Sequence, residues 1–132
     1  MDTPAGRNLI SVIVPAYNAG RYIGRCLASA GGQTYRDIEV IVVDDGSTDD
    51  TVERVREAMV ADPRVHLVQT DRGGVSRARN LAIARARGDL IAPLDADDLW
   101  TRDKLERQLA LLSKASINTG VVYCGAAGID DL

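Results

Sequence analysis

Short apolar runs rich in β-branched residues alternate with amphipathic segments, and this alternation limits most strongly what the chain can fold into. The apolar runs span residues 9–14, 38–43, 65–68 and 90–94. Such runs are typical of parallel strands that are covered on both faces. Between them, apolar residues recur at helical spacing over 21–30, 52–60 and 75–86. We therefore predict an α/β domain with a mainly parallel, Rossmann-like sheet flanked by helices.

Several residues predict where these elements begin, end or are interrupted. Pro93 interrupts the fourth run, and because proline cannot donate to a strand ladder, this strand should be irregular or lie at a sheet edge. Ser47 and Asp50 have the spacing of a capping pair for the second helix, and Thr101 can cap a fourth helix. Residues 121–124 are apolar again and predict the start of another strand.

Length and charge exclude some classes of protein. The 132 residues suit one domain, and the formal net charge of −3 lacks the basic excess expected of a general nucleic-acid-binding protein. No apolar run approaches the ~20 residues that span a bilayer. Residues 1–8 lack the apolar core of a secretion signal, so we expect a cytoplasmic chain. Two cysteines and a single histidine exclude a zinc site built from those residues.

Polar residues follow each predicted strand, at the carboxyl ends where open α/β sheets bind their ligands. They include Pro15, Tyr17 and Asn18 after the first strand, Asp44 and Asp45 after the second, Arg72, Arg77 and Arg79 beyond the third, and Asp95, Asp97 and Asp98 after the fourth. Five carboxylates at one end of a sheet repel one another strongly. Such a cluster needs hydrogen-bond donors or a divalent cation to neutralise it.

The acidic residues after the fourth strand favour a metal site. Asp95 and Asp97 can reach one hard cation, and Mg²⁺ or Mn²⁺ would take diphosphate oxygens as further ligands. The alternative is a polar loop in which Asp98 caps the next helix. Three acids in four residues, directly after an apolar strand, favour the metal interpretation.

The other polar residues fit a nucleotide, and each also has a structural alternative. Asp44 or Asp45 can accept hydrogen bonds from a nucleobase imide or a ribose hydroxyl, but both also suit a polar turn. Tyr17 offers a ring on which a base can stack, or it is a half-buried surface residue. Asn18 can simply end a turn, and Arg79 either faces a diphosphate or is a solvated helix charge.

Gly73 and Gly74 precede the third predicted helix. Backbone N–H groups at a helix N-terminus can hold an anion. A glycine pair also favours a flexible loop, so this motif leaves both interpretations open.

Four segments in register resemble the nucleotide-binding half of the family 2 glycosyltransferases of GT-A fold. They are SVIVPAYN at 11–18, EVIVVDDGSTD at 39–49, GVSRARNLA at 74–82 and GDLIAPLDADDLW at 88–100, and the resemblance covers roughly residues 9–123. The resemblance implies that Tyr17 lies by the uracil of a UDP-sugar and that Asp44 and Asp45 bind the base and its neighbourhood. It also implies that Asp95 meets the ribose or the metal, and that Asp97 is the direct metal ligand to the diphosphate. Arg79 would contact the diphosphate or sugar, and Pro15 and Asn18 would shape the first turn.

The resemblance also implies a reaction and a missing part. The reaction is inverting transfer of a sugar from a UDP-sugar to a hydroxyl of a saccharide or lipid-linked acceptor, with Mn²⁺ or Mg²⁺. The family's acidic catalytic base and acceptor-binding half come from later segments, so the base is expected beyond Leu132. We therefore expect 1–132 to be a single donor-binding domain, truncated at its C-terminus, inactive alone and able to self-associate through its open side. The intact protein could act at the inner face of a membrane.

Two other functions fit parts of the pattern. One is a non-catalytic nucleotide-binding or assembly module, because a fold does not fix a function. The other is a haloacid-dehalogenase-like phosphatase with Asp95 as nucleophile and Asp97 as acid, but that class expects the acidic motif after the first strand. A dinucleotide-binding domain is poorly supported, since no GxGxxG motif follows the first predicted strand.

Overall fold

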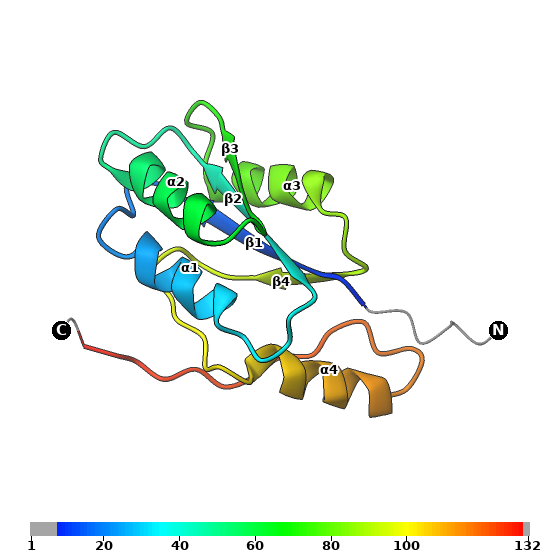
Figure 1. The fold of residues 1–132 in the computed structure, drawn as a ribbon. Helices are drawn as coiled ribbons and strands as arrows, with labels where there is room; N and C mark the ends of the chain where they lie inside the picture. The colour runs from blue at the N-terminus through cyan, green and yellow to red at the C-terminus, as the bar shows by residue number, and fades with distance from the viewer. Residues whose placement is uncertain (1–7, 131–132) are drawn as a thin grey trace.

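The computed structural model describes residues 8–130 and contains four strands and four helices in strict alternation over that range (Figure 1). Along the chain they are β1 (Ile10–Ala16), α1 (Ile23–Gly31), β2 (Ile38–Asp44), α2 (Thr51–Ala61), β3 (Val65–Gln69), α3 (Val75–Arg85), β4 (Leu90–Pro93) and α4 (Lys104–Lys114). This order confirms the predicted α/β class. The N-terminal residues 1–7, which include most of the segment inspected for a secretion signal, lie outside the described residues.

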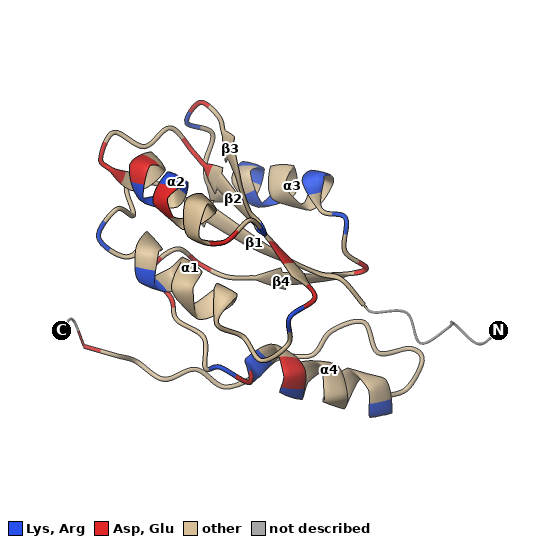
Figure 2. Ribbon diagram, viewed as in Figure 1, with Lys and Arg blue, Asp and Glu red and all other residues tan. Residues whose placement is uncertain are grey.

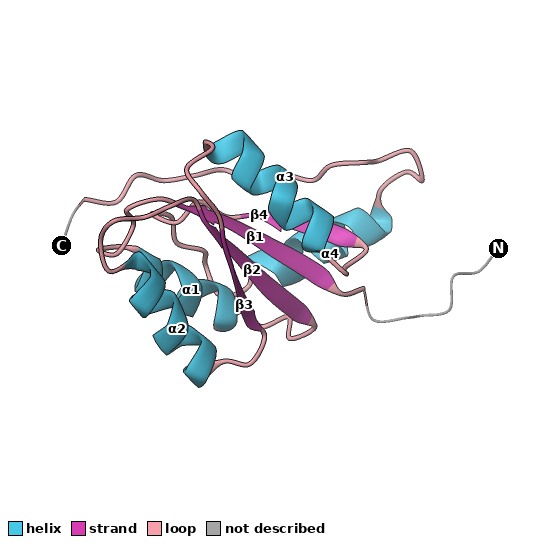
Figure 3. Cartoon of the chain, turned by 90° about the horizontal axis from the view of Figure 1, so that it is seen from above, coloured by secondary structure: helices cyan, strands magenta, loops and turns pink. Residues whose placement is uncertain are grey.

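The four strands form one parallel sheet in the order β3-β2-β1-β4. Every residue of β1 and β2 is buried, which explains why these two runs carry almost no polar alternation. Helices α1 and α2 cover one face and α3 covers the other (Figure 3). Because the chain returns from β3 to the far side of β1, the strand order reverses between β1 and β4. The carboxyl ends of these two strands flank the position where such sheets bind ligands.

Charged residues of both signs occur along the helices and loops (Figure 2). The same view shows acidic segments at the ends of β2 and β4, on the left-hand side of the sheet. These are the ends at which the sequence predicts a ligand site. Among the described residues, no helix is both long enough and apolar enough to cross a membrane.

The predicted strand at 121–124 is wrong, because residues 115–130 form neither helix nor strand. Val121 is 78% exposed and Tyr123 is 86% exposed. An apolar segment becomes a strand only where a neighbour accepts its hydrogen bonds and covers its side chains. Within residues 8–130, β4 lies at an edge of the sheet, as Pro93 predicted.

The predicted helix caps are also wrong. The Ser47 hydroxyl accepts a hydrogen bond from the Asn18 N–H at 2.9 Å, so it holds a neighbouring turn instead of a helix end. The first residue of α2, Thr51, donates its N–H to the Asp49 carboxylate at 3.0 Å. Asp50 makes no side-chain cap to α2. The fourth helix begins at Lys104, three residues beyond Thr101.

A buried carboxylate fixes the end of the sheet opposite to the predicted site. Glu39 on β2 is 3% exposed and accepts hydrogen bonds from the Ser11 hydroxyl at 2.6 Å and the Arg87 N–H at 2.7 Å. The Gly88 N–H donates to Ser11 at 2.8 Å, and a side chain at Gly88 would collide with the β1 backbone. Burial alone would raise the pKa of Glu39, but the hydrogen bonds from Ser11 and Arg87 hold it below its usual value.

We expect Glu39→Gln to lower the free energy of unfolding by about 1–3 kcal/mol at pH 7, because the amide cannot accept every donor that the carboxylate accepts. The pKa of Glu39 is lowered by folding, so its stabilisation is present above the unfolded pKa of about 4.3 and is lost as the pH falls through the folded value. Urea unfolding of both proteins at pH 7 and pH 3 measures the difference, which should shrink at pH 3.

The matched control is Glu57→Gln, because the Glu57 side chain is 69% exposed in its ion pair with Arg54, so the substitution should change stability little. Equal losses in the two variants at pH 7 would contradict a structural role for the Glu39 cluster.

Candidate functional site

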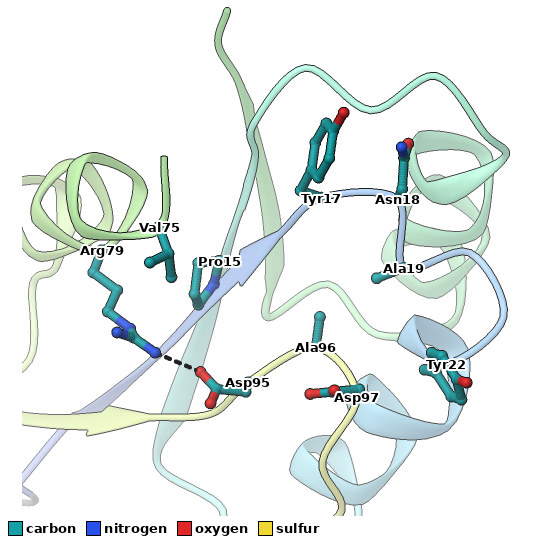
Figure 4. A pocket seen from close by; sticks show the side chains of 10 residues that line it. All are labelled: Pro15, Tyr17, Asn18, Ala19, Tyr22, Val75, Arg79, Asp95, Ala96 and Asp97. Atoms are coloured by element: carbon teal, nitrogen blue, oxygen red, sulfur yellow. Dashed lines mark hydrogen bonds and ion pairs between the residues drawn. The ribbon is translucent and has the colours of Figure 1, made fainter. Parts of the chain in front are cut away.

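A pocket of about 300 Å³ opens at the carboxyl ends of β1 and β4. It is lined by Pro15, Tyr17, Asn18, Ala19, Tyr22, Val75, Arg79, Asp95, Ala96 and Asp97 (Figure 4). These residues come from the end of β1, the start of the α1 region, the first turns of α3 and the loop that follows β4. The pocket therefore lies where the strand order reverses, as expected for an open α/β sheet.

Six of the predicted site residues lie in this pocket, and two do not. Pro15, Tyr17, Asn18, Arg79, Asp95 and Asp97 are in its lining, whereas Asp44 and Asp45 are buried outside the lining. The sequence placed these residues only at the ends of strands. The structure adds that residues about 80 positions apart share one wall, because β1 and β4 are neighbours in the sheet.

The acidic loop after β4 contributes two carboxylates with different surroundings. Asp95 Oδ1 pairs with the Arg79 guanidinium of α3 at 2.8 Å, and Figure 4 shows the Asp95 carboxylate turned toward Arg79. Among the described residues, Asp97 has no hydrogen bond or ion pair, and its carboxylate faces the pocket. Asp97 is therefore available to an external ligand, while Asp95 already holds a counter-charge.

The surroundings of this loop are strongly acidic. Burial, followed by the charges of Asp97 and Asp95, raises the pKa of Asp98. Burial and the charges of the same three aspartates raise the pKa of the nearby Cys26 thiol to about 12, so it stays protonated. A cation at this loop would relieve the repulsion between the carboxylates.

The donor set fits a hard divalent cation only if a ligand supplies further oxygens. Within residues 8–130, no three His, Cys, Asp or Glu side chains converge to hold a metal ion. Asp95 and Asp97 provide carboxylate oxygens from one short loop. Mg²⁺ and Mn²⁺ are commonly held by one or two carboxylates together with phosphate oxygens and water. The residues present therefore suit a metal–diphosphate complex rather than a metal bound by protein alone.

Asp45 is a buried anchor for the turn before α3. Its side chain is 2% exposed and accepts the N–H groups of Gly73 at 2.8 Å and Gly74 at 2.9 Å. It also pairs with Arg72. Burial alone would raise the pKa of Asp45, but the two backbone N–H groups and Arg72 hold it below its usual value. The anion held by the glycine pair is thus a carboxylate of this chain.

The sequence places Arg72 at this edge of the sheet but gives it no role in the site. Its guanidinium lies 3.5 Å from the centre of the Tyr17 ring and also bonds Asp45. Asp45 is thereby connected to the pocket through Arg72 and Tyr17, although it does not line it. In the sequence, Arg72 is a cationic residue directly before Gly73 and Gly74. That position becomes informative only once its partners, Asp45 and Tyr17, are known.

Asn18 joins the turns that follow β1 and β2. Its φ of 46° lies in the left-handed region, which asparagine tolerates better than most residues. Its side-chain oxygen accepts the Thr48 N–H at 2.8 Å. Asp44 accepts the Ser47 N–H at 3.3 Å, and its other carboxylate oxygen is buried without a partner among the described residues. The two turns thus form a shared rim beside the pocket.

Comparison with known sequences assigns this geometry to a family. The sequence model of the family described as "Glycosyl transferase family 2" matches residues 11–130. Among curated proteins, chondroitin synthase of Escherichia coli is 39% identical over 92% of this chain, which corresponds to 18% of that protein.

Two solved structures share the fold of this chain. A mannosyltransferase from Pyrobaculum calidifontis, PcManGT, in complex with GDP-Man and Mn²⁺ is 37% identical with a TM-score of 0.75, covering 80% of this chain and 32% of that one. Residues 1–349 of S. aureus TarS in complex with UDP-GlcNAc are 30% identical with a TM-score of 0.73, covering 86% and 37%. The chain thus spans about a fifth to two-fifths of the length of these relatives.

Proposed function

This chain belongs to glycosyl transferase family 2, and we propose that its pocket binds the nucleoside diphosphate of a sugar donor together with Mn²⁺ or Mg²⁺. One observation carries the proposal: the Asp97 carboxylate, which has no partner within residues 8–130, lines a single pocket together with the Arg79 cation and the Tyr17 ring, where the strand order reverses. We take the donor to be a UDP-sugar, as the resemblance implies. Related structures contain UDP-GlcNAc in one case and GDP-Man with Mn²⁺ in another, which supports the ligand class.

The two ends of the pocket suit different parts of the donor. At one end, the Tyr17 ring offers a stacking surface, and Arg72 and Asp45 add polar groups beside it. At the other end, Asp95, Asp97 and Arg79 form the charged wall. We assign the base and ribose to the Tyr17 end and the diphosphate to the charged wall, which places the sugar beyond Asp97.

The geometry suits stabilisation of a leaving group. A divalent cation at Asp97 would supply a Lewis acid for the diphosphate oxygens. Arg79 would offset the negative charge that grows on the departing diphosphate as the bond to the sugar breaks. Its pairing with Asp95 keeps the guanidinium at the pocket wall before a ligand arrives. In an inverting transfer the acceptor hydroxyl attacks the anomeric carbon from the opposite side while a base takes its proton.

We assign that base, and the acceptor-binding surface, to a part of the intact protein that follows Leu132. This chain matches only about a third of the solved transferase chains, which supports the assignment. The chain 1–132 is then a single donor-binding domain that transfers little or no sugar by itself. Self-association of this chain through its open side remains a prediction, and so does action of the intact protein at the inner face of a membrane.

Titration calorimetry with UDP, in the presence and absence of Mn²⁺, tests the proposal. We expect saturable one-to-one binding that is tighter with Mn²⁺, because Asp97 and the diphosphate would both supply oxygen ligands to the cation. GDP under the same conditions tests the choice of uridine and should bind more weakly. Equal heats with and without metal would contradict the site assignment, and tighter binding of GDP would correct the donor.

A further inference from the structure

Three residues on one side of the α1 region hold the backbone of the acidic loop. They are Cys26, Ser29 and Gln33, spaced three and four residues apart, and we call them the α1 clasp. We infer that the α1 clasp positions Asp95 and Asp97 for the cation and diphosphate. This inference rests on the proposed function, because it concerns how the same site is held in place.

Gln33 makes the strongest part of the clasp. It is 1% exposed, and its amide group uses all of its polar atoms. The amide nitrogen donates to the Thr101 carbonyl at 2.7 Å and to the Ser29 carbonyl at 3.1 Å. The amide oxygen accepts the Leu105 N–H at 3.1 Å. A buried amide with two carbonyls on one side and an N–H on the other fits in a single orientation and holds both segments in register.

Ser29 and Cys26 extend this contact toward the pocket. The Ser29 hydroxyl accepts the Trp100 N–H at 3.2 Å and donates to the Cys26 carbonyl at 2.7 Å. The buried Cys26 thiol donates to the Asp95 carbonyl at 3.3 Å. The clasp thus holds the acidic loop on both sides of Asp97: at Asp95 before it and at Trp100 after it.

The loop that the clasp contacts has little backbone hydrogen bonding of its own, apart from the Asp98 N–H, which donates to the Asp95 carbonyl at 3.0 Å. Residues 94–103 lie between β4 and α4 and belong to neither a strand nor a helix. The Asp97 side chain has no partner among the described residues, so its position follows from that of its backbone. Residues that fix the orientation of a metal ligand typically change metal affinity or activity 10–100-fold when replaced. The clasp has this arrangement relative to Asp97.

Gln33→Met tests the inference, because methionine keeps the length and apolar volume of the side chain but removes its hydrogen bonds. In the ligand-free protein, we expect amide hydrogen exchange at Trp100 and Leu105 to become about tenfold faster. In titrations with UDP, the gain in affinity from Mn²⁺ should fall about tenfold. Metal-free UDP affinity should change less than twofold, because the Tyr17 end of the pocket is untouched.

Glu39→Gln is the matched control, since it removes buried hydrogen bonds at the opposite end of the sheet. It should lower stability without changing the exchange at Trp100 or the gain from Mn²⁺. If Gln33→Met does not fold, Ser29→Ala replaces it; alanine favours the helix, and the change removes only the bonds of the Ser29 hydroxyl.

The two arms separate this inference from the proposed function. Faster exchange together with a reduced gain from Mn²⁺ supports the positioning role. Unchanged exchange at Trp100 overturns the clasp, and so does faster exchange with the full gain from Mn²⁺ retained. If the parent protein binds no UDP with Mn²⁺, the proposed function fails, and the positioning role that rests on it falls with it even where the exchange arm confirms the contact.

Discussion

Replacing Asp97 with asparagine is expected to weaken Mn²⁺ binding to the protein–UDP complex by about 100-fold or more. This exceeds the 10–100-fold loss of metal affinity that is typical when a residue that only orients a metal ligand is replaced. The reason is that Asp97 is the one carboxylate of the pocket lining without a partner among the described residues. The neutral amide keeps the size of the side chain but provides a weaker ligand for a hard cation. Calorimetric titration of Mn²⁺ into protein saturated with UDP measures the effect. The metal-free affinity for UDP should change little.

Asp98→Asn is the control for the loss of charge alone. Asp98 belongs to the same loop but does not line the pocket. Asp98→Asn removes the same formal negative charge from the loop as Asp97→Asn. If both substitutions weaken Mn²⁺ binding modestly and to a similar extent, Asp97 acts only through long-range electrostatics. Retention of Mn²⁺ affinity in Asp97→Asn would remove Asp97 from the metal site.

The second large effect is expected from Asp45→Asn, which should weaken UDP binding by about 100-fold both with and without Mn²⁺. Asp45 accepts the N–H groups of Gly73 and Gly74 and pairs with Arg72, which in turn lies on the Tyr17 ring. The asparagine amide would place its NH₂ group against the N–H groups of Gly73 and Gly74, where it cannot accept their hydrogen bonds. Arg72 would also lose its ion pair. Calorimetric titration of UDP with and without Mn²⁺ separates this loss of UDP affinity from the loss of Mn²⁺ affinity expected for Asp97→Asn.

Asp71→Asn is the matched control for this variant, because Asp71 is exposed and precedes Arg72 directly. It should leave UDP affinity nearly unchanged. A loss in Asp45→Asn that appears only when Mn²⁺ is present would place Asp45 at the diphosphate end instead of the base end. Unchanged affinity would leave Asp45 with a role in the fold alone.

The strands could be predicted because their burial is recorded directly in their composition. β1 and β2 are buried at every position, so each appears in the sequence as an apolar run. Pro93 indicated an edge strand for a local reason, since it lacks the N–H that a central strand would use. The apolar character of residues 121–124 was misleading, because strand formation depends on a pairing partner that the segment itself does not specify.

The candidate site was partly predictable for a topological reason. Residues after parallel strands meet at one edge, so Tyr17 and Asp97 could be assigned to the same region before the strand order was known. Contacts between side chains could not be assigned in this way. The acceptance of the Gly73 N–H by Asp45 depends on how the turn before α3 packs against the end of β2. The bonds of Gln33 to residues about 70 positions away likewise depend on the packing of α1.

We propose above all that a divalent cation and a nucleoside diphosphate share the pocket at the carboxyl ends of β1 and β4. Addition of Mn²⁺ to protein saturated with UDP, followed by amide NMR, tests it most directly, because the paramagnetic ion broadens nearby resonances. We predict selective broadening at Asn18, Ala96 and Asp97, with sharp signals retained at Glu39 and Arg87. Broadening that is uniform, or that is centred on Glu39, would contradict it.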